Sequence, residues 1–204
     1  MLRIDLKARK TPLQTRAQVT VEAILAAAAR VLERESPAGF NTNRVAEVAG
    51  VSIGSLYQYF PNKSALVTAL IDRHQHALAG EVEACVAARA DGPLREALAA
   101  LARIGIAQQY GRPLLSAALG HEERRLPMRS RIRGAEERIV AGIVGLLRRH
   151  GHLLSTAPSH ESARDLLVIA KALVEADAQD RRTPPPDLEG RIVRAPWGYL
   201  SATS

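Results

Sequence analysis

The feature that most constrains this chain is a tight reversal between two short helical patterns in residues 41–63. Gly50 stands between the two patterns, and Thr42 before the first is its candidate N-cap. The first pattern has an apolar side made by Val45, Ala46, Val48 and Ala49. Because glycine adopts the left-handed backbone that costs other residues about 1–2 kcal/mol, the chain can turn back within a few residues. We therefore expect two short helices joined by a tight turn.

The second short helix has an inward side and an outward side of different chemistry. Ser52 is its predicted N-cap, and Leu56 and Phe60, four residues apart, lie on the inward side. The tip and outward side then hold Ser52, Ile53, Gly54, Ser55, Tyr57, Gln58 and Tyr59. This outward face is small, polar and phenolic, which is unusual for a helix that only packs.

Such a face suits the groove of a DNA duplex. Serine and glutamine offer short donors and acceptors to base edges, and tyrosine hydroxyls reach phosphate oxygens. Gly54 costs about 1 kcal/mol relative to alanine inside a helix, and a close approach to DNA would account for it. Asn62 and Lys63 begin the next helix, whose free N–H groups and the Lys63 ammonium would face a second phosphate.

From Thr42 to Leu66 the sequence resembles the TetR family of bacterial transcriptional regulators at nearly every signature position. The resemblance extends over about residues 12–70. It implies a DNA-binding head of three N-terminal helices, followed by a more variable body that binds a ligand and dimerises. By the same resemblance, the protein would be a homodimeric repressor that a small-molecule effector releases from a palindromic operator.

The resemblance also implies a role for individual residues at the DNA. Thr42 and Lys63 would each lie beside a phosphate, and Tyr57 and Tyr59 fall at positions that contact the DNA backbone. The residues nearest the bases would be Ser52, Ile53, Gly54, Ser55 and Gln58. Ile53 stands where many members carry lysine or another polar residue. It either touches a thymine methyl group or packs against the protein.

Helical patterns occupy nearly the whole chain, so we predict an all-α fold. We expect a basic N-terminal arm in residues 1–14, a helix-turn-helix domain in residues 15–62 that begins with a capping box at Thr15, and an effector-binding and dimerisation domain in residues 63–204. The arm either lies along DNA or is a solvated tail. Further helices are predicted at residues 62–90, 94–110 and 158–178, and a helical repeat extends from Ile132 up to His150. A short apolar piece at 114–119 and a charged connection at 121–127 lie between them.

The last segment, 187–204, is ambiguous because Pro196 and Gly198 interrupt a helical pattern. In the resembled family the last two long helices form a four-helix interface with a second subunit, although their apolar sides here could equally be internal core. We predict a homodimer, since two reading helices one DNA turn apart recognise a palindrome. The polar candidates for an effector pocket are His74, Cys85, Gln108, Tyr110 and His121, and for each an ordinary packed or surface role is the stronger alternative.

Composition agrees with a polyanionic partner. The 204 residues hold 28 Lys and Arg against 21 Asp and Glu, for a formal charge of +7. Cys85 is the only cysteine, so an intrachain disulfide is impossible and a reducing cytoplasm fits. The apolar stretch Ile24–Leu32 is too short to span a membrane. We find no spacing of metal ligands and no nucleophile motif, so we expect no metal, no cofactor and no enzyme. The competing hypothesis is an all-helical protein-interaction module that lacks specific DNA binding.

Overall fold

The computed structural model describes residues 7–125, 129–155, 157–180 and 183–201, and these ranges form nine α-helices, one 3-10 turn and no strand. The prediction of an all-α fold is confirmed. The helices are α1 (Lys7–Gly39), α2 (Thr42–Ala49), α3 (Ile53–Tyr59), α4 (Lys63–Ala88), α5 (Leu94–Tyr110), α6 (Pro113–Arg125), α7 (Arg129–Arg149), α8 (His160–Asp180) and α9 (Leu188–Ser201), with the 3-10 turn at Gly151–Leu153.

Several predicted boundaries were wrong. The first helix begins at Lys7, not near Thr15, because residues 7–14 are mostly strong helix formers that continue the helix towards the N-terminus. Thr15 therefore lies inside the helix and not at its start. The predicted arm of residues 1–14 is helical from Lys7 onward, while residues 1–6 lie outside the described ranges. The segment from His121 is also helical as far as Arg125, since α6 extends through its charged residues.

The ambiguous last segment forms one helix, α9, with Pro196 inside it and buried. Two side-chain bonds attach α9 to α8: the Tyr199 hydroxyl donates to Asp165 at 2.6 Å, and Arg191 donates to Asp177 at 2.7 Å. Since the start of α8 is thereby joined to the end of α9, the two helices run antiparallel. The packing of α9 on its neighbours offsets the hydrogen bond that the proline cannot donate.

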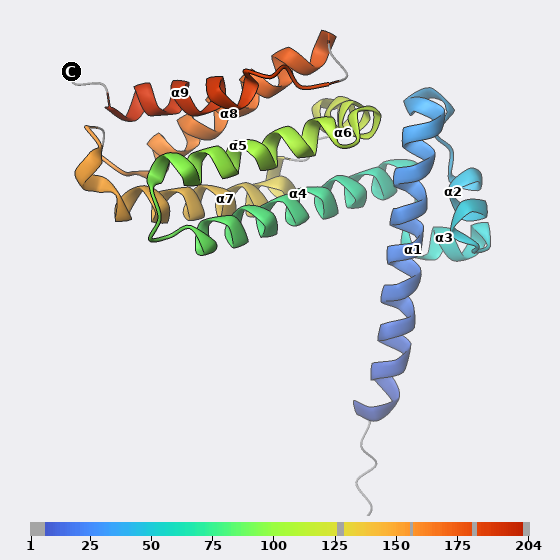
Figure 1. Cartoon of the computed structure of the whole chain (residues 1–204). Coiled ribbons are helices and arrows are strands. Elements are labelled where there is room, and N and C mark those ends of the chain that lie inside the picture. The colour runs from blue at the N-terminus through green and yellow to red at the C-terminus, as the bar shows by residue number, and fades with distance from the viewer. Residues whose placement is uncertain (1–6, 126–128, 156, 181–182, 202–204) are drawn as a thin grey trace, which may run out of the picture.

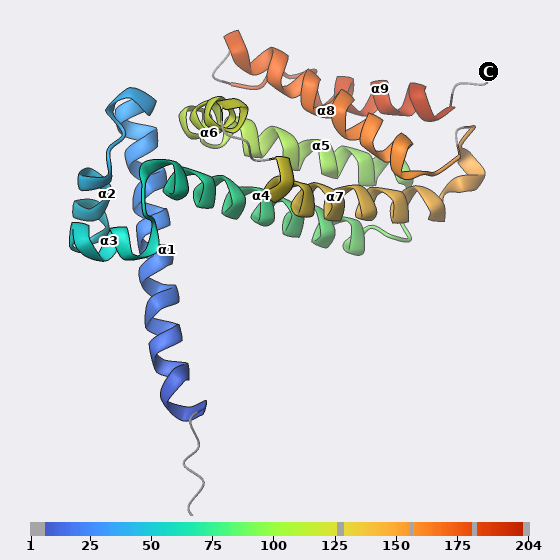
Figure 2. The same ribbon diagram turned by 180° about the vertical axis from the view of Figure 1, so that it is seen from behind.

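We call α1–α3 the head and α4–α9 the body. In Figures 1 and 2 the head lies at one end of the molecule, with α1 crossing the direction of α4 and α5, and the C-terminus lies at the opposite end. Within the body, α4 and α7 form one layer, α5 lies over them, and α8 and α9 form the outermost layer. The outermost layer is thus the part of the body farthest from α4.

The head core draws on the body. Its buried residues come from α1, α2, α3 and the first turns of α4, and three more come from α6, namely Leu115, Ala118 and Leu119. A second buried cluster joins α4, α5, α7 and α8 with the end of α9, and a third joins α5, α8 and α9. Because α6 completes the core of the head, a movement of α6 would displace side chains that pack against α1.

Gly50 makes the turn between α2 and α3. Its φ of 68° is left-handed, and its N–H donates to the carbonyls of Ala46 and Glu47 at the end of α2. Gly50→Ala should lower the free energy of unfolding by about 1–2 kcal/mol, because alanine is strained at this φ. The measurement is urea unfolding followed by circular dichroism.

Gly54 supplies the matched control, since it lies four residues further on in α3 and has no positive φ. Gly54→Ala should leave the stability of the head unchanged or raise it, because alanine is the better helix former. Equal losses in the two variants would contradict the role given to the Gly50 backbone.

Candidate nucleic-acid interface

The geometry of α3 follows from its cap and its one buried residue. The Ser52 hydroxyl accepts the N–H of Ser55 at 3.0 Å and lies 2.8 Å from the Ser55 hydroxyl, so Ser52 is the N-cap as predicted. Leu56 is fully buried in the head core, and Phe60 after the helix is buried beside it. These anchors fix which side of the short helix faces away from the protein.

The outward side of α3 is open to solvent. Ser55 is half-buried, and the exposed residues are Ser52, Ile53, Gly54, Tyr57, Gln58 and Tyr59. Ile53 is 38% exposed on this side, so its side chain is accessible to a partner. A Cβ atom at Gly54 would meet only the Ser52 hydroxyl, at 3.9 Å, which leaves the backbone of α3 accessible there.

Thr42 is not the cap of α2, contrary to the prediction. Asn41 has extended backbone angles and its side-chain oxygen accepts the Arg44 N–H at 2.9 Å, so the cap is one residue earlier and Thr42 is the first residue of the helix. The Thr42 hydroxyl lies 3.0 Å from the Tyr57 hydroxyl instead. Two of the four residues for which phosphate contacts were predicted therefore lie within hydrogen-bonding distance of each other, a pairing that spacing along the sequence does not predict.

The start of α4 has the predicted form. Asn62 caps the helix by accepting the Ala65 N–H at 2.8 Å. Lys63 follows as the first helical residue, and its ammonium lies over the ring of Phe40, 5.2 Å from the ring centre. The Phe40 ring thus holds the Lys63 side chain near the N-terminal end of α4, where the helix dipole also favours an anion.

Ion pairs connect the head to the body. Glu22 of α1 accepts from Arg73 of α4 at 2.9 Å, and Glu33 of α1 pairs with Arg112 between α5 and α6. The hydrogen bond from Arg112 holds the pKa of the Glu33 carboxyl below its ordinary value. Both pairs are partly exposed, so each adds little stability, but together they fix α1 relative to α4 and α6. Sequence analysis missed these contacts, which join residues more than fifty positions apart.

The five effector candidates do not converge on one point. His74 and Cys85 are eleven residues apart on α4, about 16 Å along the helix axis. His74 is half-buried, Cys85 is buried with Arg89 against its sulfur, and His121 is exposed on α6. Gln108 donates to both oxygens of Glu81 at 3.1 Å. Tyr110 borders a surface hollow formed with Pro184, Pro185 and neighbouring residues of α5. His74 and Gln108 share a neighbour, Glu81.

Burial lowers the pKa of His74; the nearby charge of Glu81 raises it by less, and the charge of Arg112 lowers it further. The folded protein therefore disfavours protonation of this imidazole, and the stability associated with the neutral form is lost as the pH falls below about 6.5, where the unfolded chain takes up the proton first. We expect His74→Gln to lose less stability than the parent between pH 7.5 and pH 5.5 in urea titrations. His121→Gln, at an exposed histidine, should behave as the parent; identical pH dependence in all three proteins would refute this account.

Two other kinds of site find no support in the described residues. No group of three or more histidine, cysteine, aspartate or glutamate side chains within them could hold a metal ion. Among the helices described, none combines the length and apolar character that a membrane span requires.

Comparison with known sequences places the similarity in the head. The sequence pattern of the bacterial regulatory proteins, tetR family, matches residues 24–70. An uncharacterised HTH-type transcriptional regulator of Mycobacterium tuberculosis is 36% identical over 67 residues, which is 33% of this chain and 33% of that protein. The match thus spans about a third of the length of this curated relative, while the family pattern, at residues 24–70, includes α2 and α3.

Comparison with solved structures extends the similarity to the body. A TetR-family transcriptional regulator from Mesorhizobium loti superposes with a TM-score of 0.73 at 18% identity, covering 92% of this chain and 99% of that one. The regulator FadR from Bacillus subtilis, solved with stearoyl-CoA, gives a TM-score of 0.71 at 17% identity and covers 90% of this chain and 99% of its own. At these identities the agreement concerns the fold, which is a helix-turn-helix head on a helical body.

Proposed function

Because this chain belongs to the TetR family of bacterial regulatory proteins, we propose that it is a sequence-specific DNA-binding regulator of transcription. The observation that carries the proposal is the outward side of α3, which is exposed, small and polar, and is held by a capped N-terminus and a buried Leu56. A helix of this kind presents hydrogen-bonding groups to the major groove without bulky side chains in the way.

The proposed contacts divide into two sets. The residues that would meet base edges are Ser52, Ile53, Gly54, Ser55 and Gln58. The residues that would meet phosphates are Thr42, Tyr57, Tyr59 and Lys63. The second set is supported by its arrangement, since the Thr42 and Tyr57 hydroxyls are already paired and Lys63 is held at the end of α4. Phosphate contacts of this kind fix the register in which α3 meets the bases.

The protein is proposed to act as a homodimer through α8 and α9. The outer side of this helix pair carries small or apolar residues that are open to solvent, namely Val168, Ala172, Ala176, Ala195 and Gly198. Val168 is 65% exposed. We call these five residues the outer α8–α9 face. Small residues on two antiparallel helices allow a second pair to approach closely, and a two-fold dimer places two α3 helices about 34–36 Å apart on a palindromic site.

We further propose that a small molecule bound in the body releases the protein from its operator, so that it acts as a repressor. FadR of Bacillus subtilis, which shares the fold, was solved with stearoyl-CoA. Here the contact of α6 with the head core and the Arg112–Glu33 pair provide a physical connection from the body to α1. Effector and DNA would then oppose each other by linkage. Residues 63–204 are proposed to form the effector-binding and dimerisation domain, and the cytoplasm is the proposed location.

Selection from a pool of random duplex DNA at near-physiological salt tests the function, with Tyr57→Ala run in parallel. A recovered palindromic site that the variant fails to enrich is the expected result. Enrichment of nothing, or equal enrichment by both proteins, would overturn the proposal and favour a protein-interaction module.

A further inference from the structure

A groove runs along the outside of the body between α5 and α9, and the DNA-binding function makes no use of it. It consists of two hollows of about 540 and 470 Å³ that share Pro186 and Glu189 at the start of α9. Arg95 borders one end of the groove and Tyr110 borders the other. These two residues are fifteen positions apart on α5, about 22 Å along its axis.

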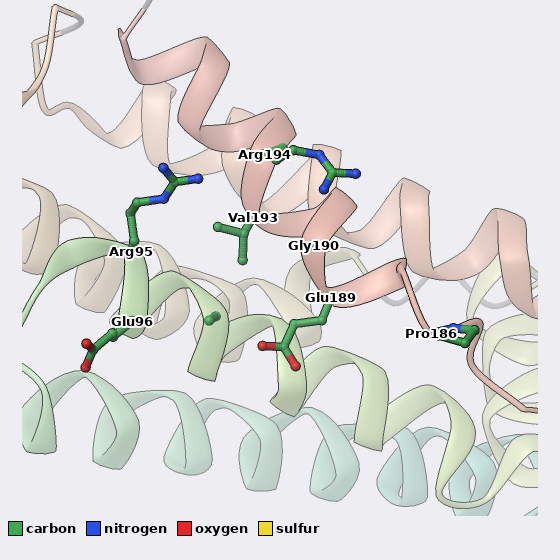
Figure 3. Close-up of a pocket in the computed structure, with 8 residues that line it drawn as sticks. Arg95, Glu96, Pro186, Glu189, Gly190, Val193 and Arg194 are labelled. Atoms are coloured by element: carbon green, nitrogen blue, oxygen red, sulfur yellow. The ribbon is translucent and has the colours of Figure 1, made fainter.

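The two ends of the groove differ in chemistry. At one end two arginines, Arg95 from α5 and Arg194 from α9, stand beside Val193 and Ala99, as the close-up shows for the labelled residues (Figure 3). At the other end the lining is mainly apolar, with Ile106, Ala107, Tyr110, Gly111 and the prolines 184–186, and its two charged members, Arg103 and Glu189, form an ion pair with each other. The groove is therefore amphipathic along its length.

The charges of Arg95 and Arg194 are not paired with a carboxylate in the part of the chain that the structure describes. Arg103 and Arg191 on the same two helices, by contrast, each have a carboxylate at 2.7 Å. Glu189 borders the groove but is the partner of Arg103. Glu96 also borders it, and in Figure 3 its side chain points away from α9, opposite to Arg95.

Arg95 lies against an aromatic ring, and Arg194 is exposed at the surface of α9. The Arg95 guanidinium lies over the ring of Trp197, 5.1 Å from the ring centre, so a ring covers its plane but not its N–H groups. Arg194 folds back over Gly190 one turn earlier, where a Cβ atom would lie 3.1 Å from its terminal nitrogen. A guanidinium whose N–H edge is available can bind carboxylate or phosphate in a bidentate manner.

We propose that this groove binds a small amphipathic anion, with its carboxylate or phosphate at Arg95 and Arg194 and its apolar part along α5 towards Pro184 and Pro185. The class of ligand follows from the two guanidiniums at one end, with which no described carboxylate pairs, and the apolar lining at the other. A regulatory role for this ligand rests on the proposed function, since α9 belongs to the proposed dimer interface. Binding of the ligand to the groove does not depend on that function. Of the effector candidates taken from the sequence, only Tyr110 borders this groove.

Trp197 is the single tryptophan of the chain and lies against Arg95, so its fluorescence reports on the site. The full-length protein, without DNA, is titrated with octanoate, octyl phosphate, acetate and n-octanol. We expect saturable changes with octanoate and octyl phosphate, and binding at least about tenfold weaker for acetate, which lacks the apolar part, and for n-octanol, which lacks the charge. The tighter of the first two identifies the anionic group. No saturable change with either anion, or equal binding of octanoate and n-octanol, would overturn the proposal.

Arg194→Gln provides the decisive variant, because it removes one guanidinium without touching the tryptophan. Octanoate should bind it about tenfold more weakly by calorimetry. Arg148→Gln removes an exposed arginine at the end of α7 and should bind as the parent does. Unchanged affinity in Arg194→Gln would overturn the assignment. Because DNA is absent throughout, failure here leaves the proposed function untouched.

Discussion

Replacing Gly54 by arginine should abolish specific binding to the operator and leave folding and dimerisation intact. The site of the change is exposed, and a Cβ atom there meets only the Ser52 hydroxyl at 3.9 Å, so the fold has room for the side chain. The same side chain would project from the side of α3 that must enter the groove. Affinity should fall to the non-specific level, a loss of about a thousandfold or more, measured by fluorescence anisotropy on the selected duplex.

Gly134→Arg is the matched control, since it adds the same charge at another exposed helical glycine, on α7, with no neighbour within 4 Å of a new Cβ atom. This variant should bind the operator as the parent does. If Gly54→Arg also retains specific binding, α3 is not the helix that enters the groove. If both variants lose it, the added charge rather than the position is responsible.

The local structure of the head could be predicted from the sequence because it depends on neighbours along the chain. The turn at Gly50, the Ser52 cap and the inward direction of Leu56 and Phe60 all follow from residue types within a few positions of one another. The prediction of Thr42 as the N-cap was wrong because Asn41, one position earlier, is an equally good capping residue. Local rules identify a helix end more reliably than they identify its cap.

The contacts that join head and body could not be predicted in this way. Leu115 and its neighbours on α6 complete the head core, and Arg112 pairs with Glu33 across 79 positions of sequence. The helical pattern of α6 shows which side is apolar, but the same pattern fits any partner helix. The proposed domain boundary at residues 62–63 therefore falls between helices, yet the cores on its two sides are not separate.

The groove between α5 and α9 was missed because it depends on the same kind of distant pairing. The sequence left open whether residues 187–204 form a helix at all. The proximity of Arg194 and Trp197 to Arg95 could therefore not be predicted. Once α9 packs on α5, an aromatic ring fixes one guanidinium, and two arginines from distant segments meet at one hollow. Polar residues chosen from helix stripes alone gave a different set, of which only Tyr110 borders this groove.

The second large effect is expected at the outer α8–α9 face. In the proposed dimer, Val168→Glu should favour the monomer, because an unpaired carboxylate would be buried against a second subunit, at a cost of several kcal/mol. In the monomer the side chain is 65% exposed, so folding should be unaffected. Operator affinity should fall at least about a hundredfold, since a single short α3 makes only half of the contacts to a palindrome. Light scattering and anisotropy at the same protein concentration measure both effects.

Leu114→Glu distinguishes loss of the interface from a general effect of adding charge to an exposed apolar residue. Leu114 on α6 is 56% exposed and lies outside the outer α8–α9 face, so this variant should remain a dimer. A Val168→Glu protein that stays dimeric would place the interface elsewhere. A monomer that keeps the parent's operator affinity would instead separate dimerisation from DNA recognition, because the two-fold arrangement of α3 helices would then contribute nothing to binding.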